Sequence, residues 1–161
     1  MKFNIIKNIV GFVVFLMASA TFAQTTKYKT MIQMENYTGK EAYIVISLIN
    51  PKGQYEKTLG ILGPDNEWYN TLKEWDKFNK KKKEKLNGIT GASVAGGDRS
   101  TFTFTIDEAK INKGYKIRFE SSVEDQKNYI NDLEIPFTTE AVTKKTDGTG
   151  YIRYVKLSKV Q

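Results

Sequence analysis

Hydrophobic and polar residues alternate along most of the chain beyond residue 24, a pattern that is typical of half-buried β-strands. In residues 101–106, Phe102, Phe104 and Ile106 are separated by threonines and are expected to point inward. Residues 42–49 are almost continuously apolar and β-branched, which predicts a central strand. Seven segments have strand character and are separated by turn residues: 27–34, 42–49, 54–62, 101–106, 115–119, 129–137 and 151–160.

One segment has a helical period instead. Its apolar residues recur at spacings of four, three and three residues: Trp68, Leu72, Trp75 and Phe78. This spacing predicts a helix over residues 67–80, with its N-terminus capped by Asp65 or Asn66. We expect the apolar stripe to pack against an edge or an end of the sheet, because paired tryptophans on one stripe more simply form a packing face than a ligand platform.

These elements together predict an all-β fold. The expected architecture is an immunoglobulin-like antiparallel β-sandwich of about seven strands with one inserted amphipathic helix, in a single domain over residues 24–161. The charged and then glycine-rich stretch of residues 80–100 is long for a connection within a domain. Such connections are either functional or disordered.

The N-terminus has the pattern of a secretory signal peptide. Lys2 and Lys7 are followed by an apolar run over residues 9–17 and by small residues that end at Ala23. We expect cleavage after Ala23 and a periplasmic or secreted protein. The alternative is a retained membrane anchor, but the apolar run is shorter than the roughly 20 residues that a bilayer-spanning helix needs.

The composition narrows the chemistry. The chain has 161 residues, of which none is His or Cys. These absences exclude Ser-His-Asp and Cys-His catalysis, His or Cys zinc sites and disulfides. The acidic pairs at residues 107–108 and 124–125 are more simply solvated turn residues than metal ligands. We therefore expect no catalytic residues, no metal site and no enzymatic activity.

The net charge is +7 and the isoelectric point is about 9.4. In a cytosolic protein this charge would suggest nucleic acid as a partner. Outside the cytosol, anionic lipid, polysaccharide or an acidic protein face is the more natural partner.

Several local patterns, in this order along the chain, resemble one family. Residues 42–62 form a hairpin pattern, and Trp68, Leu72 and Trp75 are similar to a W-x-x-x-L-x-x-W helix. Residues 87–93 are similar to a D-A-V-T-G-A-T loop, and residues 114–120 to a G-x-Y-x-(aliphatic)-x-x-E strand. The order of these patterns resembles that in the family of predicted periplasmic proteins called domain of unknown function 2271, over roughly residues 29–137.

The resemblance implies an exported protein of uncharacterised function. Family members are described as similar to the immunoglobulin-like part of the flagellar hook-capping protein, which is a similarity of fold alone. Their gene neighbours, membrane flavoprotein reductases and a flavin transferase, imply an extracytosolic redox or iron-linked system. We therefore expect a non-enzymatic accessory component with a periplasmic or membrane protein partner, and we expect no nucleic acid partner.

One motif carries candidate chemistry. Thr90, Gly91, Ala92 and Ser93 resemble the acceptor loop of that flavin transferase, D-x-x-(S/T)-G-A-(S/T), whose final hydroxyl forms a phosphoester with flavin mononucleotide (FMN). Asn87 stands where the pattern has Asp. The alternative hypothesis is therefore a flavinylated electron carrier with covalent FMN at Ser93, in which the lysines of residues 80–85 complement the phosphate. The competing interpretation is a glycine-rich loop that serves only as a turn.

Overall fold

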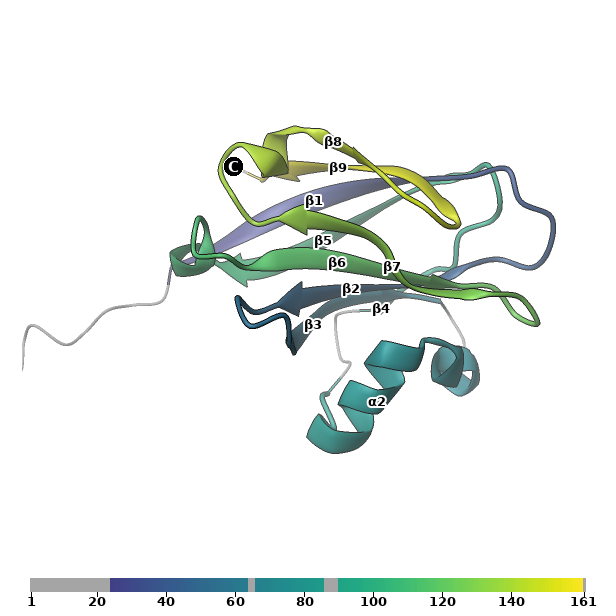
Figure 1. The fold of residues 1–161 in the computed structure, drawn as a ribbon. Helices are drawn as coiled ribbons and strands as arrows, with labels where there is room; N and C mark the ends of the chain where they lie inside the picture. The colour runs from purple at the N-terminus through teal and green to yellow at the C-terminus, as the bar shows by residue number, and fades with distance from the viewer. Residues whose placement is uncertain (1–23, 64–65, 86–89, 161) are drawn as a thin grey trace, which may run out of the picture.

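The computed structural model describes residues 24–63, 66–85 and 90–160, and it is a two-layer β-sandwich (Figure 1). The first sheet has the strand order β5-β1-β9-β8 and the second has the order β4-β3-β2-β6-β7. The strands of the first sheet are β1 (Thr25–Met34), β5 (Arg99–Asp107), β8 (Lys145–Asp147) and β9 (Ile152–Lys159). The strands of the second sheet are β2 (Tyr43–Ile49), β3 (Tyr55–Leu62), β4 (Thr90–Gly91), β6 (Lys116–Ser122) and β7 (Asn128–Pro136).

The predicted all-β sandwich is confirmed, and each of the seven expected strands is present, with ends that differ from the expected ones by at most three residues. The structure adds β4 and β8, which are two and three residues long and too short to show an alternating pattern. Neighbouring strands are antiparallel, except that β4 runs parallel to β3.

The core between the sheets consists of the inward residues of each alternating strand. On β1 every second residue from Thr26 to Met34 is buried. Phe104 and Ile106 on β5 are also buried, and Phe102 is partly buried against the same core. The centre of the core has no exposed surface and includes Ile32, Ile44, Ile46, Ile117, Phe119, Ile135 and Phe137.

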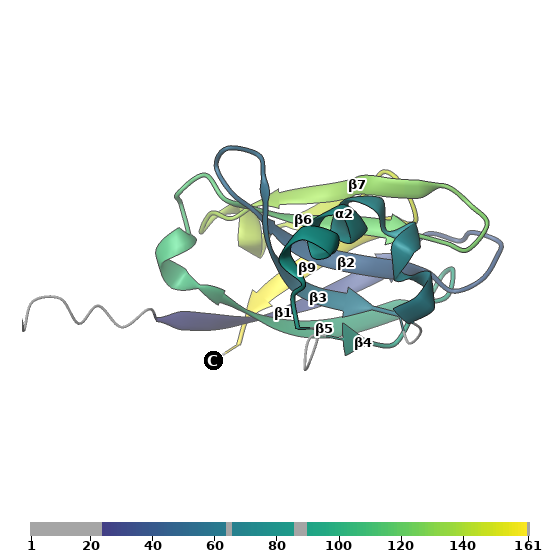
Figure 2. The same cartoon turned by 90° about the horizontal axis from the view of Figure 1, so that it is seen from below.

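The second sheet needs a cover on its outer face, because every residue of β2 is buried. That cover is the segment of the 3₁₀ helix η1 (Asn66–Thr71) and the α-helix α2 (Lys73–Lys82), which lies across the face of the second sheet in Figure 2. Together the strands and this segment form a second apolar cluster: Tyr43, Val45, Ile61, Tyr69, Leu72 and Trp75. The predicted helix is therefore split into two pieces and packs on a face of the sheet, where an edge or an end was expected.

Helix α2 is capped by a residue from the sheet. Its own N-cap residue, Leu72, offers no side-chain hydrogen bond. Glu120 on β6 is only 2% exposed, and its two carboxylate oxygens accept the backbone N–H groups of Glu74 and Trp75, both at 3.1 Å. Asn128 donates a third hydrogen bond to the same carboxylate at 3.1 Å. Glu120 therefore satisfies donors that the first turn of a helix leaves unpaired.

Both predicted cap positions come well before the start of α2 in the sequence. Asp65 lies outside the described residues, and Asn66 begins η1, so the α-helix starts well beyond both positions. A carboxylate at the start of α2 also lies at the positive end of the helix dipole. Even so, burial raises the pKa of Glu120 above its usual value, and the hydrogen bonds from α2 and Asn128 only partly offset this effect.

A second buried carboxylate joins the two sheets. Asp132 on β7 has no exposed surface. Its oxygens accept the backbone N–H groups of Thr149 at 2.9 Å, Gly150 at 2.7 Å and Ile152 at 2.9 Å, and the hydroxyl of Ser121. Because Ile152 begins β9 of the first sheet, Asp132 ties an edge of the second sheet to the β8–β9 turn.

We predict that Asp132→Asn lowers the free energy of unfolding by about 3 kcal/mol, because the amide nitrogen would face backbone donors in a buried site. Urea unfolding followed by tryptophan fluorescence measures the change. Glu140→Gln is the control, because the Glu140 carboxylate forms an exposed ion pair with Lys144, and it should cause no measurable loss. Equal stability of Asp132→Asn and wild type would contradict this role.

Glu120→Gln tests the electrostatic cost of the cap. Because its pKa is raised, Glu120 binds a proton more tightly in the folded state than in the unfolded chain. Its contribution to the free energy of unfolding therefore rises as the pH falls from above the raised pKa toward the usual value of 4.5. We expect the free energy of unfolding of wild type to increase relative to the variant between pH 7 and pH 5, by at most about 1.4 kcal/mol per pH unit. A difference that stays constant or shrinks on acidification would show that burial does not dominate.

Candidate functional site

The acceptor-like motif lies at the edge of the second sheet. Thr90 and Gly91 form β4, and the carbonyl of Gly91 accepts the N–H of Gly63 at 2.8 Å. A short distance further on, Ala42 and Val94 exchange two backbone hydrogen bonds, at 2.8 and 3.2 Å. Only Ala92 and Ser93 lie between these anchored positions. The described part of the expected loop, residues 90–93, is therefore a short link that is held by the sheet at both ends.

Ser93 is half-buried, and its hydroxyl donates a hydrogen bond to the carboxylate of Glu41. Its side chain borders a shallow surface pocket of about 320 Å³. The other residues that line this pocket are Lys40, Glu41, Tyr43 and Glu124. The hydroxyl is thus presented at the surface beside a group that can accept its proton.

The cation beside Ser93 is paired with a carboxylate. Lys40 lies 2.6 Å from Glu124, and the hydrogen bond between them raises the pKa of Lys40 above its usual value. The ammonium group of Lys40 also lies 6.0 Å from the centre of the Trp68 ring. One cation and two carboxylates therefore surround the hydroxyl.

Of the predicted site residues, the structure brings Thr90, Gly91, Ala92 and Ser93 together, with Thr90 and Ala92 exposed. Asn87 lies outside the described residues. The lysines that were expected to complement a phosphate lie in the last turn of α2 and directly after it. Within the described part of the chain, the cation that lines the Ser93 pocket is instead Lys40. Sequence reasoning missed Lys40 and Glu41 because they are remote in the sequence and belong to no motif.

The acidic pair at residues 107–108 has a structural role. Asp107 accepts the N–H of Ala109 at the start of a 3₁₀ turn, η2 (Glu108–Lys110). Glu108 binds Lys159 at 2.5 Å and the hydroxyl of Thr26 at 2.9 Å, and these contacts lower the pKa of Glu108.

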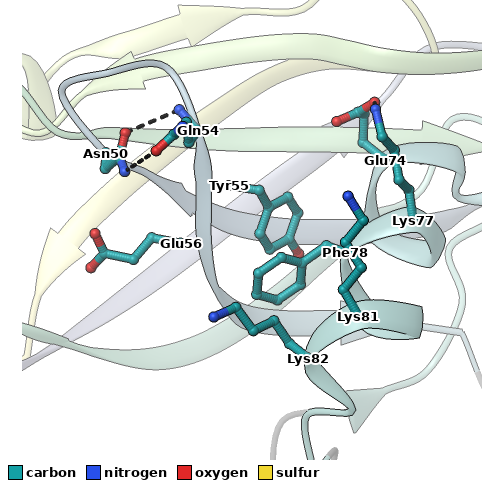
Figure 3. A pocket seen from close by; sticks show the side chains of 9 residues that line it. All are labelled: Asn50, Gln54, Tyr55, Glu56, Glu74, Lys77, Phe78, Lys81 and Lys82. Carbon is teal, nitrogen blue, oxygen red and sulfur yellow. Dashed lines mark hydrogen bonds and ion pairs between the residues drawn. The ribbon is translucent and has the colours of Figure 1, made fainter.

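A larger groove lies between α2 and the β2–β3 hairpin, and we call it the α2 groove (Figure 3). Its volume is about 620 Å³. It is lined by Asn50, Gln54, Tyr55, Glu56, Glu74, Lys77, Phe78, Lys81 and Lys82. The rings of Tyr55 and Phe78 stack in its centre, with centroids 4.2 Å apart. Burial raises the pKa of Tyr55 far above its usual value, so this hydroxyl stays protonated.

The fold is an all-β sandwich, and the two candidate sites described above lie at its surface. The chain belongs to the family described as predicted periplasmic protein, domain of unknown function 2271, which matches residues 25–154. The resemblance inferred from the sequence is thereby confirmed, and so is the periplasmic location. No curated protein and no solved structure matches the chain.

The N-terminal predictions have a different outcome. Residues 1–23, with the predicted signal peptide and its cleavage after Ala23, lie outside the described residues. Among the helices of the described ranges, none combines the length and the apolar character needed to cross a membrane.

Proposed function

We propose that this chain is a non-enzymatic accessory domain of the periplasm that works by docking to a periplasmic or membrane protein. Support comes from the two buried carboxylates, because both are occupied by structural donors. Glu120 accepts three hydrogen bonds and Asp132 accepts four. A general acid or base needs a proton or a lone pair directed at its substrate. The place of this domain in a redox or iron-linked system rests on the family resemblance.

The docking face in this proposal is the end of the sandwich that carries the Ser93 pocket. Three segments contribute to it: Lys40 and Glu41 before β2, Ser93 after β4, and Glu124 after β6. Lys40 and Glu41 are exposed, and both signs of charge are present. Mixed charge at a surface favours selective and reversible contact with a protein of complementary charge.

Site-specific photo-cross-linking in the native periplasm tests the docking face. We expect a cross-linker at the exposed Ala92 to give a discrete adduct with a partner protein. The control is a cross-linker at Thr103, which is exposed on β5 of the first sheet and should give no such adduct. Equal adducts from both positions, or none from Ala92, would contradict this docking face.

A second candidate function is a covalent flavin carrier with FMN on Ser93, and one observation favours it. The Ser93 hydroxyl is bonded to Glu41, which can accept its proton when a phosphoester forms. Lys40 lines the same pocket and can pair with the phosphate when it leaves Glu124, while the carboxylates of Glu41 and Glu124 oppose the added negative charge. Bound flavin would supply the redox chemistry, and the chain would position it. Asn87 in place of Asp is the departure from the acceptor pattern.

Intact-mass spectrometry separates the two functions. After periplasmic co-expression with a flavin transferase, a flavin carrier gains the mass of one FMN less water on the peptide that contains Ser93. Ser93→Ala should abolish the gain, and Ser158→Ala should preserve it, because Ser158 is an exposed hydroxyl on β9. An unmodified wild-type mass, or a gain that survives Ser93→Ala, would reject attachment at Ser93.

A further inference from the structure

We propose that the α2 groove binds an oligosaccharide that contains uronic acid. This inference is independent of the docking function and of the Ser93 pocket, because it rests on other residues. The volume of about 620 Å³ lies within the range of ligand-binding clefts. The chemistry of three parts of the groove identifies the ligand class.

The centre of the groove is an aromatic stack. Tyr55 comes from β3 and Phe78 from α2, and their rings lie at an interplanar angle of 25°. Both rings are only partly buried, and Tyr55 is also held by a hydrogen bond between its hydroxyl and Thr58 at 3.1 Å. Such a stack offers apolar ring surface to the C–H face of a sugar. Because the stack exists without ligand, little side-chain freedom is lost on binding.

The helix side of the groove carries the cations. Lys77 lies 3.8 Å from Glu74 and is partly neutralised. Lys81 and Lys82 are both exposed and form no ion pair among the described residues. Figure 3 shows both lysines beside Phe78, where they can bind a carboxylate of the ligand.

The hairpin side carries neutral and acidic groups. The side-chain oxygen of Asn50 accepts the backbone N–H groups of Lys52 and Gln54, at 2.9 and 3.0 Å, which fixes the turn. The Gln54 side chain is exposed above this turn, and Glu56 is paired with Lys110 at 2.6 Å. A carboxamide and a carboxylate at this side can bind the hydroxyl groups of a sugar.

The two acidic side chains decide between possible ligands. Glu56 and Glu74 can accept hydrogen bonds from hydroxyl groups, which a sugar offers and the side chains of an acidic peptide lack. A uronic acid combines a carboxylate for Lys81 and Lys82, hydroxyl groups for Glu56, Glu74 and Gln54, and a C–H face for Phe78. It is therefore the ligand class whose chemistry matches each side of the groove.

Calorimetric titration of the full chain with tetragalacturonate tests the proposal. We expect saturable binding that weakens about tenfold or more in Lys81→Ala/Lys82→Ala, the effect of losing a charge-assisted hydrogen bond. Phe78→Leu should also weaken binding while the melting temperature confirms that the variant is folded. The matched control is Lys27→Ala/Lys29→Ala, which removes the same charge from exposed positions on β1 and should leave the affinity unchanged.

Two comparison probes sharpen the outcome. Fully methyl-esterified tetragalacturonate should bind at least about tenfold more weakly, because it lacks the carboxylates. Short polyglutamate should not compete. Any of three results would overturn the proposal: no saturable binding of tetragalacturonate, an equal loss in the β1 control, or competition by polyglutamate, which would indicate an acidic protein segment as the ligand.

Discussion

Burial of β2 on both faces is the constraint on which the rest of this structure depends. One face of the strand lies in the core between the sheets, and the other would be exposed to water without the η1–α2 segment. The cover is held by apolar contacts of Leu72 and Trp75 and by the carboxylate of Glu120, which gives the helix its cap. The polar anchor is costly, because burial of a carboxylate opposes its ionisation. The backbone hydrogen bonds from α2 to Glu120 offset part of that cost.

The structural roles of Glu120 and Asp132 also bear on where the candidate binding surfaces lie. The two buried acids hold α2 to the sheet and one sheet to the other, and both proposed sites use groups outside the core. The link at Ala92 and Ser93 is anchored on both sides by backbone hydrogen bonds, and the α2 groove is walled by a helix and a hairpin. Both surfaces are built on rigid elements although they lie at the periphery, which favours precise presentation of their side chains.

The strands and the apolar stripe of the helix could be predicted from the sequence, because their periods of about 2 and 3.6 residues are local properties. The strand β4 could not, since it takes its conformation from pairing with β3. Likewise, no local signal links Glu120 to α2 or Lys40 and Glu41 to Ser93, because those contacts arise when distant segments meet. The sequence motif identified Ser93 as a candidate, whereas the α2 groove is lined by residues of β3, of the turn before β3 and of α2 that form no sequence motif.

The sheet-derived cap also has a consequence for the order of folding. Helix α2 has ten residues, and isolated helices shorter than about 12–15 residues are marginal in water. Its cap comes from β6, which is synthesised later than α2. The helix should therefore become stable only after β6 has paired with β2, so its formation depends on contacts between segments that are distant in the sequence. Folding that depends on such distant pairing is slow relative to the formation of an autonomous helix. During this interval Trp75 and the outer face of β2 remain open to other chains, a hazard that a chaperone for exported proteins would relieve.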